Sequence, residues 1–159
     1  MISVAGWRRR VRGDHAALGA QRVREILADQ PVEDVAAVVH AVAAHRFRTD
    51  PQPSTLEAQV LFDADKLDAI GAVGVARAFA YGGAHGQRLW ARRESVDLDR
   101  WDAEGDVLDD HTPVHEFVVK LSRIRDCLFT STARAIAAER HDVMVAFFER
   151  LSQEVRGLA

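Results

Sequence analysis

The segment from Phe62 to Gly74 places three carboxylates directly before a stretch of small, uncharged residues. Asp63, Asp65 and Asp68 lie within six residues, and Ala69 to Gly74 contains no side chain larger than isoleucine. Carboxylates that open a buried helix are costly unless a metal ion, a basic partner or a proton compensates their charge. The segment therefore predicts a metal or phosphate site beside a closely packed helix, rather than a solvated surface.

The composition is that of one domain with a substantial core. The chain has 159 residues, of which 48% are hydrophobic, and a formal net charge of −3. This balance gives no signal for binding nucleic acid or an anionic membrane, and no apolar stretch reaches the ~20 residues that a spanning helix needs. The single cysteine, Cys127, excludes an internal disulfide framework. The basic cluster at residues 8–12 has no apolar region after it, so we expect a cytoplasmic protein.

Apolar residues recur at helical spacing through most of the chain, which predicts an all-α protein. Gln30-Pro31 and the two prolines at positions 51 and 53 interrupt the pattern, and Ser54 with Glu57 matches a capping box. Residues 88–111 are polar and weakly periodic, which predicts a long loop. We expect helices at residues 15–29, 31–48, 54–79, 113–128 and 131–151. Asp14 can cap the first, Thr112-Pro113 starts the fourth, and Thr130 or Ser131 caps the last.

Helical geometry separates the three acids of the run. Asp65 and Asp68 are three residues apart and share a face, whereas Asp63 and Asp65 point to roughly opposite sides. At most two of them can bind one ion, and another pairs with a base or caps the backbone. Asp65 is the favoured ligand, while Asp63 and Asp68 could equally be acids that interact with the helix dipole.

Basic residues near the acidic run are candidates for binding phosphate. His45 is followed by Arg46 near the end of a predicted helix, and an arginine fork suits phosphate oxygens. The alternative is an ordinary cation pair at a helix C-terminus. Lys66 is either a further phosphate ligand or a surface charge. His40 lies five residues before His45 and diverges from it by more than a quarter turn, so one of the two is a surface or core histidine.

Several segments resemble the HD-superfamily hydrolases of the bacterial nucleotide-phosphohydrolase branch. The resemblance covers residues 14–152, is specific at the acidic run, and is carried by His45-Arg46-Phe47, Glu57-Ala58, Asp63-Ala64-Asp65-Lys66-Leu67-Asp68-Ala69-Ile70-Gly71-Ala72 and Ala76-Arg77-Ala78-Phe79-Ala80-Tyr81-Gly82-Gly83. It implies an HD-domain-like bundle of about five helices over residues 14–155. Residues 1–13 would form a disordered or atypical tail before it.

The resemblance also implies a metal-dependent phosphohydrolase. A divalent ion (manganese, magnesium, iron or cobalt) activates water against a phosphoester or pyrophosphate in this family. Alignment places Asp65 at the last metal ligand and implies catalytic roles for His45 and Asp63. His15, Arg46 and Lys66 would bind the phosphate of a small-molecule substrate, expected to be a nucleotide.

This chain departs from the family pattern at its start. The family's early histidine and its adjacent His-Asp dyad have no counterpart before Asp14. We therefore expect a chain that lacks the family's first helices, binds metal weakly and is impaired as an enzyme. The alternative is a non-catalytic helical interaction module derived from an HD domain. Apolar faces left uncovered would favour a homo-oligomer.

Overall fold

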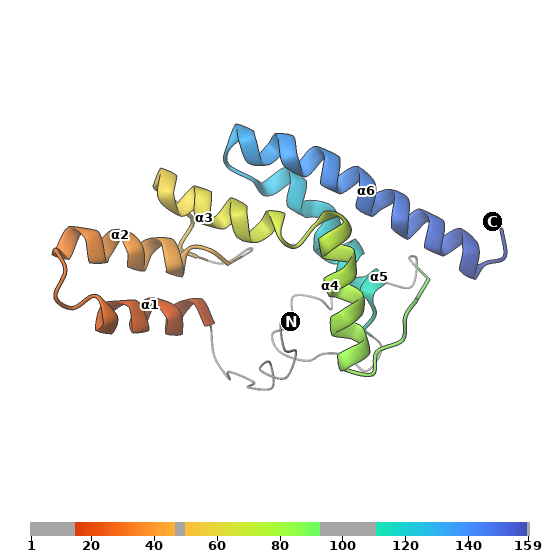
Figure 1. Cartoon of the computed structure of the whole chain (residues 1–159), viewed down its shortest axis with the longest axis horizontal. Coiled ribbons are helices and arrows are strands. Elements are labelled where there is room, and N and C mark those ends of the chain that lie inside the picture. Colours follow the sequence, from red (N-terminus) through yellow and green to blue (C-terminus); the bar gives the residue numbers. More distant parts are fainter. Residues whose placement is uncertain (1–14, 47–49, 93–110, 159) are drawn as a thin grey trace. The chain divides into compact units, whose positions relative to one another are not determined.

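The computed structural model describes residues 15–46, 50–92 and 111–158, and within these ranges the regular structure is entirely helical (Figure 1). The all-α class is therefore confirmed. These ranges hold six α-helices and one 3-10 helix, more than the five helices predicted. The predicted tail at residues 1–13, the cap at Asp14 and most of the predicted loop at 88–111 lie outside them. The chain divides into two compact units, residues 1–62 and 63–159.

The first unit is built on an antiparallel pair of helices, α1 (His15–Ile26) and α2 (Val32–Ala43), which lie side by side in Figure 1. Their contact uses small residues, because a Cβ added to Gly19 would lie 3.1 Å from Val42 Cγ1. Both helices end earlier than the predicted residues 29 and 48. The buried side chains of this unit are mostly alanines, so its core is thin: Ala16, Ala20, Val39, Ala41, Ala44, Ala58 and Phe62.

Helix α3 (Leu56–Leu67) begins one residue later than the predicted capping box requires. Thr55, not Ser54, caps it, because Ala58 N–H donates to Thr55 Oγ1 at 3.2 Å. Ser54 instead contacts His40 Nε2, through its backbone N–H at 3.1 Å and its hydroxyl at 2.9 Å. The prediction of a Ser54 cap is wrong because a histidine 14 residues away engages that side chain.

The predicted helix at 54–79 is two helices, since α3 ends at Leu67 and α4 runs from Gly71 to Ala84. Gly71 has φ +75°, a left-handed conformation that favours glycine. A Cβ at Gly74 would lie 2.2 Å from the carbonyl oxygen of Ala69, so a larger residue cannot occupy this position. The two glycines therefore form a corner, and the prediction of one continuous helix is wrong.

The second unit continues with α5 (Pro113–Val119), the 3-10 helix η4 (Leu121–Cys127) and α6 (Ser131–Val155). Thr112 caps α5 and Thr130 caps α6, each by accepting a backbone N–H with its side chain. The predicted helix start at Thr112-Pro113 is confirmed, and of the two predicted caps for the last helix, Thr130 and Ser131, the first is the cap. The predicted helix at 113–128 is divided at Lys120, which leaves the helical region. This unit has a continuous core formed by Ile70, Val75, Val114, Phe117, Leu121, Ile124, Leu128, Ala133, Ala137, Met144 and Phe148.

Candidate functional site

The first carboxylate of the acidic run, Asp63, is buried and fully engaged. Its exposed fraction is 2%. Its Oδ1 accepts the backbone N–H of Phe129 at 2.9 Å, and its Oδ2 accepts the backbone N–H and the hydroxyl of Thr130, both at 2.8 Å. Asp63 thus bonds to the segment that opens α6. This arrangement matches the alternative in which one acid of the run caps backbone amides.

The second carboxylate, Asp65, lies at the surface and pairs with the next residue. Lys66 Nζ donates to Asp65 Oδ2 at 2.5 Å, and the side chains are 6% and 53% exposed, respectively. A buried ammonium needs a counter-charge, and Asp65 supplies it. Within the described residues Asp65 Oδ1 has no hydrogen-bond partner. Asp65 therefore has a half-exposed side chain with one carboxylate oxygen that accepts no hydrogen bond from the described residues, and carboxylate oxygens are the ligands that hard divalent ions prefer.

The third carboxylate, Asp68, belongs to the corner between α3 and α4. Arg77 donates to the side chain of Asp68 and, at 3.0 Å, to its backbone carbonyl. Arg140 of α6 donates to the carbonyl oxygen of Leu67. Two guanidinium groups thus satisfy carbonyls at the C-terminus of α3, where positive charge is favourable. Asp68 and Arg77 pair with each other, so this acid has a structural partner.

The predicted phosphate ligands His15 and His45 meet in the first unit. Their ring centroids are 5.2 Å apart in an edge-to-face arrangement. His45 Nδ1 lies 2.6 Å from the carbonyl oxygen of Val42, so Nδ1 carries the hydrogen and donates it. In the neutral ring this tautomer leaves Nε2 as an acceptor or ligand atom. Arg46 follows His45 and is partly buried.

The predicted site residues therefore form two groups. His15, His45 and Arg46 belong to residues 1–62, while Asp63, Asp65 and Lys66 belong to residues 63–159. In the described part of the chain, no three histidine, cysteine, aspartate or glutamate side chains gather closely enough to hold a metal ion. As a carboxylate with an open oxygen, Asp65 fits one position in the coordination sphere of a divalent ion, and further ligands would be needed for tight binding.

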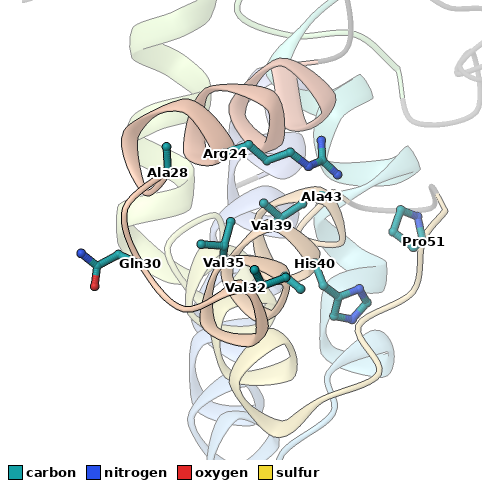
Figure 2. Close-up of a pocket in the computed structure, with 10 residues that line it drawn as sticks. Arg24, Ala28, Gln30, Val32, Val35, Val39, His40, Ala43 and Pro51 are labelled. Atoms are coloured by element: carbon teal, nitrogen blue, oxygen red, sulfur yellow. The ribbon is translucent and has the colours of Figure 1, made fainter.

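A groove of about 620 Å³ lies on the helical pair of the first unit (Figure 2). Aliphatic side chains of α2 form half of its lining, and Arg24, Gln30 and His40 contribute its polar groups. The predicted site residues are not in this lining. Sequence reasoning left open which of His40 and His45 is a surface or core residue. It missed both the groove and the bond to Ser54, because each depends on how α2 packs.

Sequence reasoning also missed an ionic cluster around Glu116 on α5. Lys120 Nζ donates to Glu116 Oε1 at 3.0 Å, and His111 Nε2 lies 3.6 Å from Oε2. Burial raises the pKa of Glu116, but the hydrogen bond from His111 and the charge of Lys120 outweigh it and hold that pKa below its ordinary value. The spacing of Glu116 and Lys120, four residues apart, was a signal that could have revealed this pair.

Cys127 lies near the buried end of the acidic run. Burial raises the pKa of its thiol, and the nearby ammonium of Lys66 only partly offsets this effect. Its Sγ–H donates to the carbonyl oxygen of Ile124 at 3.0 Å. The thiol is therefore protonated near neutral pH and has no nucleophilic character.

Comparisons with known proteins identify the family. The HD-domain model matches residues 8–70. The protein YpgQ of Bacillus subtilis is 34% identical over 130 residues, which cover 79% of this chain and 55% of YpgQ. The structure of YpgQ in complex with ADP aligns with a TM-score of 0.64 at 31% identity, over 87% of this chain and 63% of that chain. An HD-superfamily hydrolase from Bacillus thuringiensis aligns with a TM-score of 0.61 at 28% identity, over 87% of this chain and 63% of that chain.

The chain belongs to the HD-domain superfamily. The resemblance carried by the acidic run is thereby confirmed at the level of the superfamily. The chain spans 55% of the length of YpgQ. None of the helices in residues 15–46, 50–92 and 111–158 combines the length and the apolar character that a bilayer crossing requires.

Proposed function

We propose that the chain is part of a metal-dependent phosphohydrolase that acts on a nucleotide or a similar phosphate ester or anhydride. The observation that carries the proposal is the half-exposed carboxylate of Asp65 beside the buried ammonium of Lys66, in a chain of the HD-domain superfamily. A solved relative was crystallised with ADP, which supports a nucleotide substrate. Cytoplasmic localisation remains part of this proposal.

Five of the predicted residues have a role in this proposal that suits their chemistry. Asp65 would be one ligand of a divalent ion (manganese, magnesium, iron or cobalt), and the bound ion would supply the Lewis acidity that activates water. In its doubly protonated form His45 would donate Nε2–H to a phosphate oxygen, while its Nδ1–H donates to the carbonyl oxygen of Val42. Arg46, His15 and Lys66 would neutralise phosphate charge. With one carboxylate ligand among the described residues, we expect this chain alone to bind the ion weakly and to turn over slowly.

The test is hydrolysis of nucleoside di- and triphosphates by the chain with millimolar Mn²⁺ or Mg²⁺. Ion-exchange chromatography would follow the shortened nucleotide and the phosphate or pyrophosphate released with it. Asp65→Asn should lower turnover by about 100-fold or more, since even groups that only orient a metal ligand contribute about 10–100-fold. Asp126→Asn is the matched control, because this exposed carboxylate lies on η4 and pairs with Arg125. It should leave turnover unchanged.

Two outcomes would contradict the proposal. One is no turnover of any nucleoside di- or triphosphate, either by the chain or by the longest in-frame product of its coding region. The other is turnover that Asp65→Asn leaves intact. Assaying both proteins, the 159-residue chain and the longest in-frame product, distinguishes weak metal binding by the chain from the absence of the activity.

A second candidate function is a non-catalytic helical module that associates with a second copy of itself. The observation that favours it is the apolar surface of α2, where Val32 is 81% and Val38 41% exposed. A helix that is apolar on several sides is ordinarily covered. The groove shown in Figure 2 lies on this helix.

A further inference from the structure

Asp63 lies two residues from Asp65, the proposed metal ligand, but its side chain points to the other side of the helix and is buried. Residues two apart on a helix point about 200° apart. Asp63 is 2% exposed, whereas the side chain of Asp65 is 53% exposed. The three hydrogen bonds that Asp63 accepts occupy both of its carboxylate oxygens. The chemistry of Asp63 is therefore directed at the protein itself.

The partners of Asp63 are a strong set for a buried carboxylate. Two are backbone N–H groups at the start of α6, a helix of 25 residues, where the helix dipole favours negative charge. The third is the hydroxyl of Thr130, which in turn accepts the backbone N–H of Ala133 at 3.2 Å. One threonine thus links Asp63 to the first turn of α6.

A second attachment to α6 lies just beyond Asp65 and Lys66. Arg140 donates to the carbonyl oxygen of Leu67, the last residue of α3. Gly71 permits this approach, because a Cβ at that position would lie 2.9 Å from Arg140 Cβ. The segment from Asp63 to Leu67 is therefore held to α6 at both ends, and Asp65 lies between the two attachments.

We propose that Asp63 and Thr130, with the backbone N–H of Phe129, form a clamp that positions Asp65, and that Asp63 is a positioning residue instead of a reacting group. The clamp fixes the helical turn from which the Asp65 carboxylate projects. A metal ligand must be held within about 0.5 Å of its productive position, which requires such support. This inference rests on the proposed function, in which Asp65 binds a divalent ion.

The clamp can be tested by titrating the ¹⁵N-labelled chain with Mn²⁺ alone and measuring paramagnetic broadening of the amide signals of residues 64–67. Broadening detects weak binding. Its midpoint is the Mn²⁺ concentration that gives half of the maximal broadening, and this concentration rises when the Asp65 carboxylate is displaced. Asp63→Asn replaces one of the two accepting oxygens with an amide N–H₂ that faces donors, and Thr130→Val removes the hydroxyl donor. We expect the midpoint to rise about 10-fold in Asp63→Asn and about 3-fold in Thr130→Val, in line with groups that orient a ligand.

Two further variants separate positioning from stability. Thr130→Ser retains the hydroxyl and should restore the midpoint of the unaltered chain. Ile124→Val lowers the melting temperature by removing a methyl group from the core, at a residue that is 0% exposed and makes no bond to the clamp. It should leave the midpoint unchanged. Amide hydrogen exchange at residues 64–67 is the second measurement, and it should accelerate selectively in Thr130→Val and Asp63→Asn.

The outcomes are distinct. Thr130→Val and Asp63→Asn could behave like Ile124→Val, with a lower melting temperature but no change in the Mn²⁺ midpoint or in the amide exchange of residues 64–67. The clamp would then be only structural, and the inference would be overturned. If the unaltered chain shows no localised broadening near Asp65 while the clamp variants accelerate exchange there, the proposed function fails and the clamp is supported. If Asp63→Asn is unfolded, Thr130→Val against Thr130→Ser decides the question.

Discussion

Three aspartates of one short run have three different environments, and their partners explain why. Asp63 is buried because three donors satisfy it, and Asp68 pairs with Arg77 at the corner between α3 and α4. Asp65 balances a buried lysine while half of its own surface stays in solvent. The free-energy cost of burying a charged carboxylate thus depends on the donors around it more than on its position in the run.

The Glu116 cluster makes stability depend on pH. The pKa of Glu116 is lower in the folded state than its ordinary value of 4.5. A group with a depressed folded pKa contributes stability that is fully present above its unfolded pKa and is lost as the pH falls through its folded pKa. At about pH 7 we expect Glu116→Gln to lower the free energy of unfolding by about 1.5–3 kcal/mol, the range for a hydrogen bond to a charged group.

Thermal unfolding across the acidic range checks this expectation. The difference between Glu116→Gln and the unaltered chain should shrink as the pH falls below 4.5 and through the lower pKa of folded Glu116, because the unfolded chain takes up the proton first and the folded carboxylate only at lower pH. Glu149→Gln is the control, since Glu149 is exposed on α6 and has no ion pair with the described residues. A difference for Glu116→Gln that does not vary with pH would show that its charge does not stabilise the fold.

At the scale of elements, the corner between α3 and α4 decides how the acidic run is presented. Arg77 and Arg140 satisfy carbonyls at the end of α3, and Gly71 takes the left-handed conformation that starts α4. The corner ends α3 soon after Asp65 and Lys66. The conformation of Gly71 therefore contributes directly to the geometry of the candidate site.

Substitution of Gly71 by alanine tests the corner. Alanine at φ +75° costs about 1–2 kcal/mol, and its Cβ would also lie 2.9 Å from Arg140 Cβ. We therefore expect Gly71→Ala to lower the free energy of unfolding by at least about 1 kcal/mol in urea denaturation. Gly83→Ala is the matched control in the same helix, where a Cβ meets nothing within 4 Å and alanine should stabilise by about 0.5–1 kcal/mol. Equal effects at both positions would refute this account of the corner.

At the scale of the whole molecule, the two units differ in the composition of their cores. The second unit has a continuous core of large side chains, including the stacked rings of Phe117 and Phe148, 4.3 Å apart. The buried positions of the first unit are mostly alanines, and its α2 exposes valines. A unit with little buried apolar area has less intrinsic stability. Covering α2 with a second copy would supply some of the missing area.

Self-association is the measurable consequence of the second candidate function. Light scattering after size exclusion should show a mass that increases with concentration, and Val32→Lys should raise the dissociation constant at least about 10-fold by placing a charge in an apolar contact. Val155→Lys is the control, because this valine is 50% exposed but lies at the end of α6 in the other unit. A monomer at every concentration up to about 1 mM would exclude this candidate. The dissociation constant would then exceed about 1 mM, which is too weak for a functional dimer.

Features that depend on near neighbours in sequence were predictable. The caps at Thr112 and Thr130 follow from threonine placed before a helical pattern. The separation of Asp63 from Asp65 follows from helical geometry alone. The Glu116–Lys120 pair has the same local origin, although the sequence reasoning did not include it.

Features that depend on distant contacts were not predictable. Ser54 does not cap α3 as predicted, because its hydroxyl bonds to His40, 14 residues earlier. Asp63 accepts a hydrogen bond from Thr130, 67 residues away, and the carbonyl oxygen of Leu67 accepts one from Arg140, 73 residues away. Local propensity favours a continuous helix from 54 to 79, but the chain turns where Gly71 takes a left-handed conformation and packs against Arg140.

The sequence by itself determined the all-α class, the helix caps at two of the helices and membership of the HD-domain superfamily, because periodicity, capping chemistry and the acidic run are written in neighbouring residues. The tertiary structure decided which aspartate is buried, which keeps an exposed oxygen and where the third predicted helix breaks. The physical reason is that a carboxylate is buried only where donors from another helix meet it. Those donors are brought into place by packing that no local pattern encodes.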